Sequence, residues 1–205
     1  MSLSLAVCGQ AKKAKPSIFY KHTLSIAPLA LLDFDNTLLL SAEHRFNRRW
    51  AINTDFGYTF ATYYLTNVDH TTGFTVRPAA RMYFGKRSEL FWQAQVLYKQ
   101  VNYTITDWLG KECVNNVPAY EQFQQFKFRK RVAGLNVMTG EVMPLSSRLF
   151  FEISAGLGVR QKIQKVVGEE NSCYKTNTAE FPNLYRAKMT TISAPISLRL
   201  VYKID

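Results

Sequence analysis

The stretch WAINTDFGYTF, from Trp50 to Phe60, alternates between two kinds of side chain almost without a fault. Apolar residues recur at every second position, and small or polar residues stand between them. A period of two predicts a β-strand whose two faces differ. The apolar face points inward in a soluble barrel or sandwich, and outward to lipid in a membrane barrel. Which face meets water therefore decides the class of protein.

The same alternation recurs along the whole chain, whereas helical periodicity is weak. Many regular strands of this kind are typical of a barrel or sandwich. We predict eight strands, at residues 22–31, 37–46, 50–60, 74–84, 90–105, 126–138, 149–162 and 192–204.

The predicted connections alternate in length after the first one. Those at 61–73, 106–125 and 163–191 are long, and those between them are shorter. In an up-and-down barrel, alternate connections lie at opposite ends, and outer-membrane barrels have short periplasmic turns and long outer loops. The sequence thus predicts an all-β fold, an eight-stranded antiparallel up-and-down transmembrane β-barrel with short periplasmic turns and longer outer loops.

Length and charge narrow the function classes. The 205 residues suffice for one domain, and no apolar run reaches the roughly 18 residues of a membrane helix. The net charge of +11 indicates a polyanionic partner. The basic residues are spread along the chain without a zinc-finger spacing or an RNA-binding aromatic signature, so we do not expect nucleic-acid binding.

The first residues, MSLSLAVCGQAKKAKP, look like the tail of a secretory signal. An apolar run precedes Gly9-Gln10-Ala11, which fits a small-x-small cleavage site. We expect a signal peptide at 1–11, a barrel domain at 12–205, and export to the outer membrane of a Gram-negative cell.

If the apolar faces point outward, charged side chains fill the interior, where they must pair. Glu43 and Glu152 fit a catalytic carboxylate pair or, as we favour, part of a structural ion network that plugs the lumen. The predicted network comprises Glu43, Arg45, Asp55, Arg77, Arg81, Glu152, Arg160, Arg199 and Lys203.

Basic residues also gather near the predicted outer ends of the last strands. Such side chains suit lipopolysaccharide phosphates, and a solvated basic rim is the alternative. The candidates for lipopolysaccharide contact are Lys127, Arg129, Arg131, Lys165, Arg186 and Lys188.

Cys113 and Cys173 fall in the two longest outer loops. Disulfides persist outside the cytoplasm, so we expect either a bridge between the loops or two free thiols. The three histidines, His22, His44 and His70, form no His-x-Ser pattern, and we read His70 as a solvated loop residue. We expect no catalytic site, metal or cofactor.

The stretches NRRWAINTDFGYTF, FTVRPAARMYF, LYKQVNYTITDWLGKECVNNVPAYEQF, KFRKRVAGLNV and RLFFEISAGLGVRQKIQKVVG span most of residues 46–168. Here the chain resembles the small outer-membrane β-barrel proteins of Bacteroidota-type bacteria, of the DUF3575 or porin-like type. The resemblance implies an eight-stranded outer-membrane barrel and no agreed activity.

We therefore expect a non-enzymatic, monomeric barrel that contacts outer-membrane lipid and lipopolysaccharide. Its role would be structural or interactive, with partner binding through the outer loops or narrow-pore transport. Two alternatives stay open at this point, namely a soluble lipocalin-like barrel with an apolar ligand and a lipid A-modifying enzyme.

Overall fold

The computed structural model describes residues 20–63, 65–115, 117–174 and 188–204, and their regular elements are strands apart from one short 3-10 helix. No helix in these ranges is long and apolar enough to cross a membrane. The elements are β1 (His22–Ile26), η1 (Pro28–Leu32), β2 (Thr37–Arg45), β3 (Trp50–Thr59), β4 (Val68–Phe84), β5 (Leu90–Lys111), β6 (Tyr120–Pro144), β7 (Leu149–Val167), β8 (Lys188–Ser193) and β9 (Ile196–Lys203).

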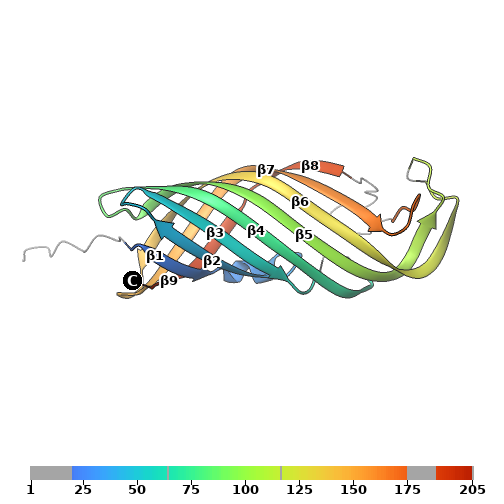
Figure 1. Cartoon of the computed structure of the whole chain (residues 1–205), viewed down its shortest axis with the longest axis horizontal. Coiled ribbons are helices and arrows are strands. Elements are labelled where there is room, and N and C mark those ends of the chain that lie inside the picture. Colours follow the sequence, from blue (N-terminus) through green and yellow to red (C-terminus); the bar gives the residue numbers. More distant parts are fainter. Residues whose placement is uncertain (1–19, 64, 116, 175–187, 205) are drawn as a thin grey trace, which may run out of the picture.

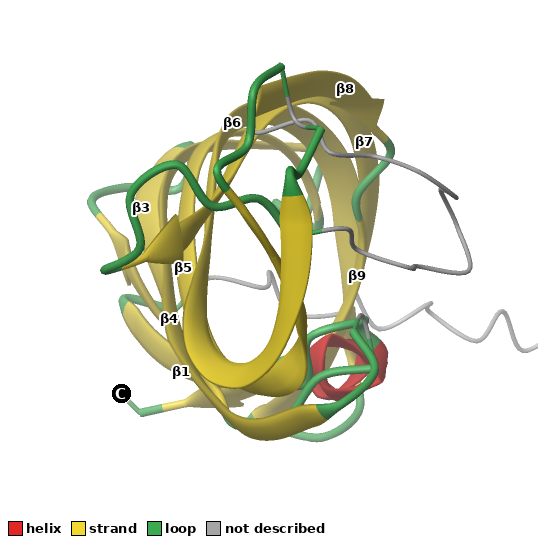
Figure 2. Ribbon diagram, turned by 90° about the vertical axis from the view of Figure 1, so that its right-hand side faces the viewer, coloured by secondary structure: helices red, strands yellow, loops and turns green. Residues whose placement is uncertain are grey.

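The strands form one antiparallel sheet that closes on itself. Each strand from β1 to β7 pairs with the next, and β9 pairs with both β7 and β1. β8 pairs with the far part of β7, so β8 and β9 share one place in a ring of eight strands (Figures 1 and 2). The all-β class and the eight-membered antiparallel arrangement predicted from the sequence are confirmed.

The connections divide the ring into two ends. The tight turns at 46–49, 85–89 and 145–148 lie with the carboxyl end of the chain, at what we call the turn end (Figure 1). The segments at 27–36, 60–63, 65–67, 112–115, 117–119 and 168–174 lie at the opposite loop end.

The strands on one side of the ring are longer than the sequence pattern indicated. β5 and β6 pair without interruption from Leu90↔Glu141 to Lys111↔Tyr120. β4 and β7 also extend beyond their predicted limits toward the loop end. The predicted loops at 61–73, 106–125 and 139–148 were therefore too long, because cross-strand partners continue the ladder where alternation weakens. β5 and β6 project from the loop end as a tall hairpin (Figure 1).

Two strands are shorter or broken, and proline explains both differences. The first was predicted to reach residue 31, but β1 ends at Ile26 and Pro28 begins η1. The last was predicted to run from 192 to 204, but Ala194 and Pro195 separate β8 from β9. Proline has no backbone N–H to donate to a ladder, so a strand containing it loses a hydrogen bond there.

Candidate functional site in the ring interior

The apolar faces of the strands point away from the ring. In β3, Trp50, Phe56 and Tyr58 are each at least half exposed, whereas Asn53 and Asp55 are buried inside. The interior leaves little space beside small residues, since a Cβ added at Gly57 would lie 2.7 Å from Cγ2 of Thr37. The ring thus has an apolar outside and a polar inside over much of its height.

Arg81 is the centre of an ion cluster near the turn end. Its Nη1 lies 2.7 Å from a Glu43 oxygen, and its Nη2 lies 2.7 Å from Oε1 of Glu152. Its Nε donates to Oε1 of Gln93 at 2.6 Å, and the Tyr83 hydroxyl donates to Glu43 at 2.8 Å. All these side chains are buried, so each charge is compensated by an opposite charge or a hydrogen bond.

The cluster continues on both sides of Arg81. Arg45 donates to Glu43 at 3.0 Å, and its guanidinium lies over the rings of Tyr20 and Tyr83, at 3.9 and 3.4 Å from their centroids. Arg199 lies 2.9 Å from Asp55 and 3.7 Å from Glu152. An aromatic layer thus borders the charges at the turn end, and the charged network crosses the whole ring interior.

The structure brings six of the nine predicted interior residues into this network: Glu43, Arg45, Asp55, Arg81, Glu152 and Arg199. Arg77, Arg160 and Lys203 stay outside it, because none of them reaches a carboxylate of the described residues within ion-pair distance. The tyrosine and glutamine partners were not singled out from the sequence, although alternation places them on the same inner face.

A second ion cluster, which was not predicted from the sequence, lies nearer the loop end. Asp35 lies 2.5 Å from Nζ of Lys130 and 3.4 Å from Nζ of Lys99, and it accepts a hydrogen bond from Tyr103 at 2.8 Å. Asp35 was assigned to a connection, and its partners come from β5 and β6, far away in the sequence. The sequence indicated this cluster only through the alternation of β5 and β6, which places Lys99 and Lys130 on the inner face.

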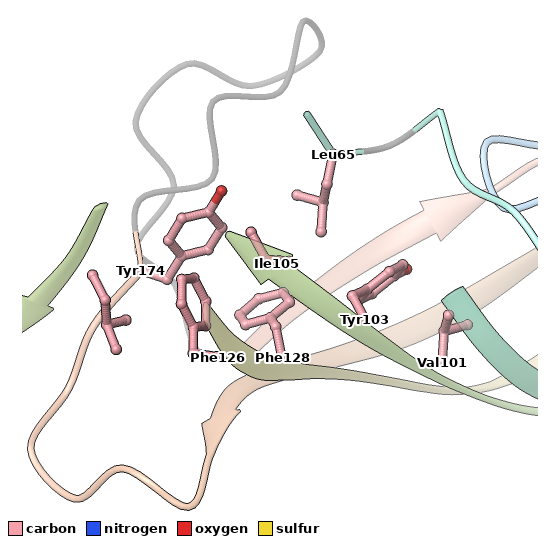
Figure 3. Close-up of a cluster of buried hydrophobic side chains, with 8 residues drawn as sticks. Leu65, Val101, Tyr103, Ile105, Phe126, Phe128 and Tyr174 are labelled. Carbon is pink, nitrogen blue, oxygen red and sulfur yellow. The ribbon is translucent and has the colours of Figure 1, made fainter. Parts of the chain in front are cut away.

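Beyond this cluster, the tall hairpin reverses its polarity. We call its projecting part, residues 100–111 and 120–131, the crown. Apart from Lys130, which belongs to the second ion cluster, its buried residues form an apolar cluster that Leu65 and Tyr174 cover from neighbouring loops (Figure 3). The buried members are Leu65, Val101, Tyr103, Ile105, Leu109, Phe126, Phe128 and Tyr174.

A disulfide joins Cys113 to Cys173, the two cysteines singled out from the sequence. It links the loop after β5 to the segment after β7, and backbone hydrogen bonds between Gly110 and Cys173 continue the contact. Next to it, the Tyr174 hydroxyl donates to Asp107 at 2.9 Å. Burial, assisted by this carboxylate, raises the pKa of Tyr174 above its ordinary value.

Five of the six basic residues proposed for lipopolysaccharide contact lie on one outward surface. Arg129 is opposite Lys165, and Ile163 lies between Arg131 and Lys188 in the paired strands. The sixth, Arg186, lies outside the described residues, as does the predicted signal peptide at 1–11. The outward members, which we call the basic patch, are Lys127, Arg129, Arg131, Lys165 and Lys188.

The histidines do not assemble with these groups. The rings of His22 and His44 stack at the turn end with centroids 4.7 Å apart. His70 lies in β4 and not in a loop, because β4 begins earlier than predicted. Within the described part of the chain, no group of three or more His, Cys, Asp or Glu side chains is placed to hold a metal ion.

A closed antiparallel ring with an apolar outside and a charged inside defines the chain as a barrel-like all-β protein. No curated protein and no solved structure matches it. Residues 3–204 match the family described as protein of unknown function (DUF3575), and the chain belongs to that family.

Proposed function

We propose that the protein is a non-enzymatic β-barrel of the outer membrane, exported by a Gram-negative cell. Its interior is plugged by ion clusters, and its role is structural or interactive through the loop end. The observation that carries the proposal is a reversal of polarity within single strands. Between the turn end and the crown, β5 and β6 bury polar residues together with apolar ones such as Phe91 and Met138, and their exposed residues are mainly apolar. In the crown the buried residues are mainly apolar and the exposed ones mainly polar.

The reversal can be followed residue by residue. Near the turn end, Gln95 and Asn136 are buried, whereas Val96, Leu135 and Val137 are at least half exposed. In the crown, Val101 and Ile105 are buried, and the outward positions carry Gln, Asn, Thr, Lys and Arg up to Trp108 and Phe123. An exposed apolar surface around a ring is favourable in lipid, and a polar surface is favourable in water. The change therefore fits a barrel that leaves the bilayer at residues 99–100 and 131–132.

Refolding with and without detergent micelles tests the membrane position. We expect a β-rich species whose gel mobility changes on boiling and which forms only with detergent. A monomer that folds fully in detergent-free buffer would contradict the membrane position and favour a soluble barrel instead.

The basic patch supports a more specific contact with lipopolysaccharide. Its side chains lie on three adjacent strands just beyond the apolar surface, at the level where headgroup phosphates would lie. Arg129 and Arg131 are held against β5 by hydrogen bonds to Asn102 at 2.8 Å and Gln100 at 2.9 Å. Guanidinium groups bind phosphate through charge-assisted hydrogen bonds, so this surface is suited to lipid A.

The contact is tested with Lys127→Gln/Arg129→Gln in micelles that contain lipid A. The matched control is Lys86→Gln/Arg148→Gln, which removes two exposed cations at the turn end. We expect the patch variant alone to bind lipid A more weakly, and dephosphorylated lipid A to show no difference between the variants. Equal lipid A binding by both variants would exclude the patch as a phosphate contact.

The interior supports a structural role more than a catalytic one. Glu43 and Glu152, the candidate carboxylate pair, both bind Arg81 and are buried. Carboxylates compensated in this way are poor general acids or bases, because the neighbouring cation stabilises the ionised form. Partner binding is proposed for the loop end, where the hairpin tip exposes Val114, Val117 and Tyr120.

A further inference from the structure

The wall of the ring is incomplete between β1 and β9. β1 pairs with β9 only from Thr23↔Lys203 to Ile26↔Leu200. On this side, no strand of the described residues pairs with β9 from Ile196 to Arg199, and β9 contacts the short helix η1 instead (Figure 2). Pro195, at the break before β9, cannot donate to a partner either. The side of the ring therefore has an opening here that backbone pairing does not close.

A cavity of about 370 Å³ occupies this opening. Leu29, Leu32 and Ile196 line it from the side of η1 and β9, and Arg77 and Arg160 line it from the ring interior. Asp33 is the one acidic residue of the lining, so cations outnumber anions there. The cavity joins an apolar outer wall to a cationic inner wall.

The two arginines have unused hydrogen-bonding capacity. The Nε atoms of Arg77 and Arg160 are buried without a hydrogen-bond partner among the described residues, and neither side chain makes an ion pair with a described carboxylate. Nη1 of the neighbouring Arg199 is unpartnered in the same way. Buried donor atoms without acceptors, on neighbouring side chains of like charge, are unfavourable, and a bound anion would compensate them. This distinguishes the opening from the ion clusters, where every cation meets a carboxylate.

An apolar groove continues from the opening along the outer face. It has a volume of about 280 Å³ and is lined mainly by Leu24 and Ile26 of β1, Leu40 of β2, and Leu200 and Tyr202 of β9. Ile26 adjoins Ala27 of the cavity, and Leu200 lies on the same outward face of β9 as Ile196, with Leu198 between them. The groove and the cavity are thus consecutive along both strands.

We propose that this side opening binds a single-chain anionic amphiphile, such as a fatty acid, with its carboxylate at Arg77 and Arg160. The hydrocarbon chain passes between η1 and β9 and lies in the groove. The combination of a compact cationic cavity and an adjoining apolar groove matches a molecule with one charged end and one acyl chain. The inference rests on the proposed membrane position, because only then does the groove face an apolar surrounding.

Binding is measured with dodecanoate and the wild-type protein in nonionic micelles, by calorimetric titration against a micelle blank. We expect saturable binding that weakens roughly tenfold to a hundredfold in Arg77→Gln/Arg160→Gln, since charged hydrogen bonds of this kind contribute on that order. The control Arg48→Gln/Arg49→Gln, at an exposed turn, should leave binding unchanged. Arg160→Lys in the wild-type background should retain much of the affinity, because it keeps the charge.

Two further ligands test the contributions of the carboxylate and of the hydrocarbon chain separately. Methyl dodecanoate, which lacks the charge, and acetate, which lacks the chain, should each bind far more weakly. Ala30→Trp should block the cavity and abolish binding with both arginines in place. Equal binding of acetate and dodecanoate, or unchanged dodecanoate binding in the double glutamine variant, would overturn the proposal.

The same samples are run unboiled on a gel to report the folded barrel. Wild-type protein that shows the shifted band but does not bind dodecanoate would refute the amphiphile site alone. Absence of the shifted band from the wild type and every variant would refute the proposed membrane barrel itself.

Discussion

The crown and the turn-end half of β5 and β6 belong to the same two strands, yet they are built in opposite ways. The crown has an apolar inner face and a mostly polar outer face, as a water-soluble hairpin with its own small core would have. The turn-end half buries Gln93, Gln95 and Lys99 and exposes Trp92 and Val96. Backbone pairing is continuous through both halves, so the ladder itself does not set the polarity.

The difference shows that two halves of the same pair of strands can be stabilised in two ways. In the turn-end half, ion pairs and hydrogen bonds hold the interior together, and their strength depends on complete pairing. In the crown, burial of apolar side chains supplies the stability, and the loops that carry Leu65 and Tyr174 cover the apolar cluster. Substitutions that affect one half should therefore have little effect on the other.

The largest expected effect comes from Arg81, at the centre of the ion cluster near the turn end. Arg81→Met removes the cation that Glu43 and Glu152 share, which leaves Glu43 with Arg45 and Glu152 with Arg199 at 3.7 Å. Loss of one partner from a buried ion network costs about 3–5 kcal/mol. We expect the free energy of unfolding in micelles to fall by about that amount, measured by urea titration. Arg48→Met, in an exposed turn, should change it by less than about 0.5 kcal/mol. A similar result for both variants would mean that the network does not stabilise this half.

A cation placed on the apolar outer face of the ring should cost more stability than one placed on the polar outer face at the level of the crown. Phe56→Arg puts a cation on the exposed apolar face of β3, and Thr72→Arg puts it on the outward face of β4 at the level of the crown. In lipid vesicles, the first should cost about 2–4 kcal/mol, as cations do on a lipid-facing strand at mid-membrane depth. The second should cost about 0–1 kcal/mol, near the interface. Equal costs, measured by the same urea titration, would remove the distinction between the halves.

Much of this organisation could be predicted from the sequence, because alternation records which residues share a face. It gave the strand positions and the inward parity of Arg81, Glu152 and Arg199. It could not give the height of the crown, since residues 106–111 and 120–125 become strands through pairing with each other. It also missed Asp35, whose partners Lys99 and Lys130 are brought to it only by closure of the ring.

The disulfide gives a smaller effect confined to the loop end. Cys113→Ser/Cys173→Ser releases two segments that cover the crown, and removal of such a bridge costs roughly 2 kcal/mol or less when the unfolding is local. We expect faster amide hydrogen exchange at residues 109–114 and 171–174, with unchanged exchange in β3 near Asp55. Faster exchange throughout the ring would show that the two halves unfold together.

The smallest effect is expected from Tyr174→Phe, which removes one hydrogen bond to Asp107 and keeps the ring in the crown cluster. Stability of the crown should fall by about 0.5–1.5 kcal/mol, read from amide exchange of β5 near Leu109. The raised pKa of Tyr174 gives the sign of a pH effect. A phenol whose pKa is higher in the folded state stabilises that state fully below its unfolded pKa of about 10 and progressively less as pH rises above it. Alkaline pH should therefore reduce crown protection in the wild type more than in Tyr174→Phe, and equal losses would show that this phenol does not contribute to the stability of the crown.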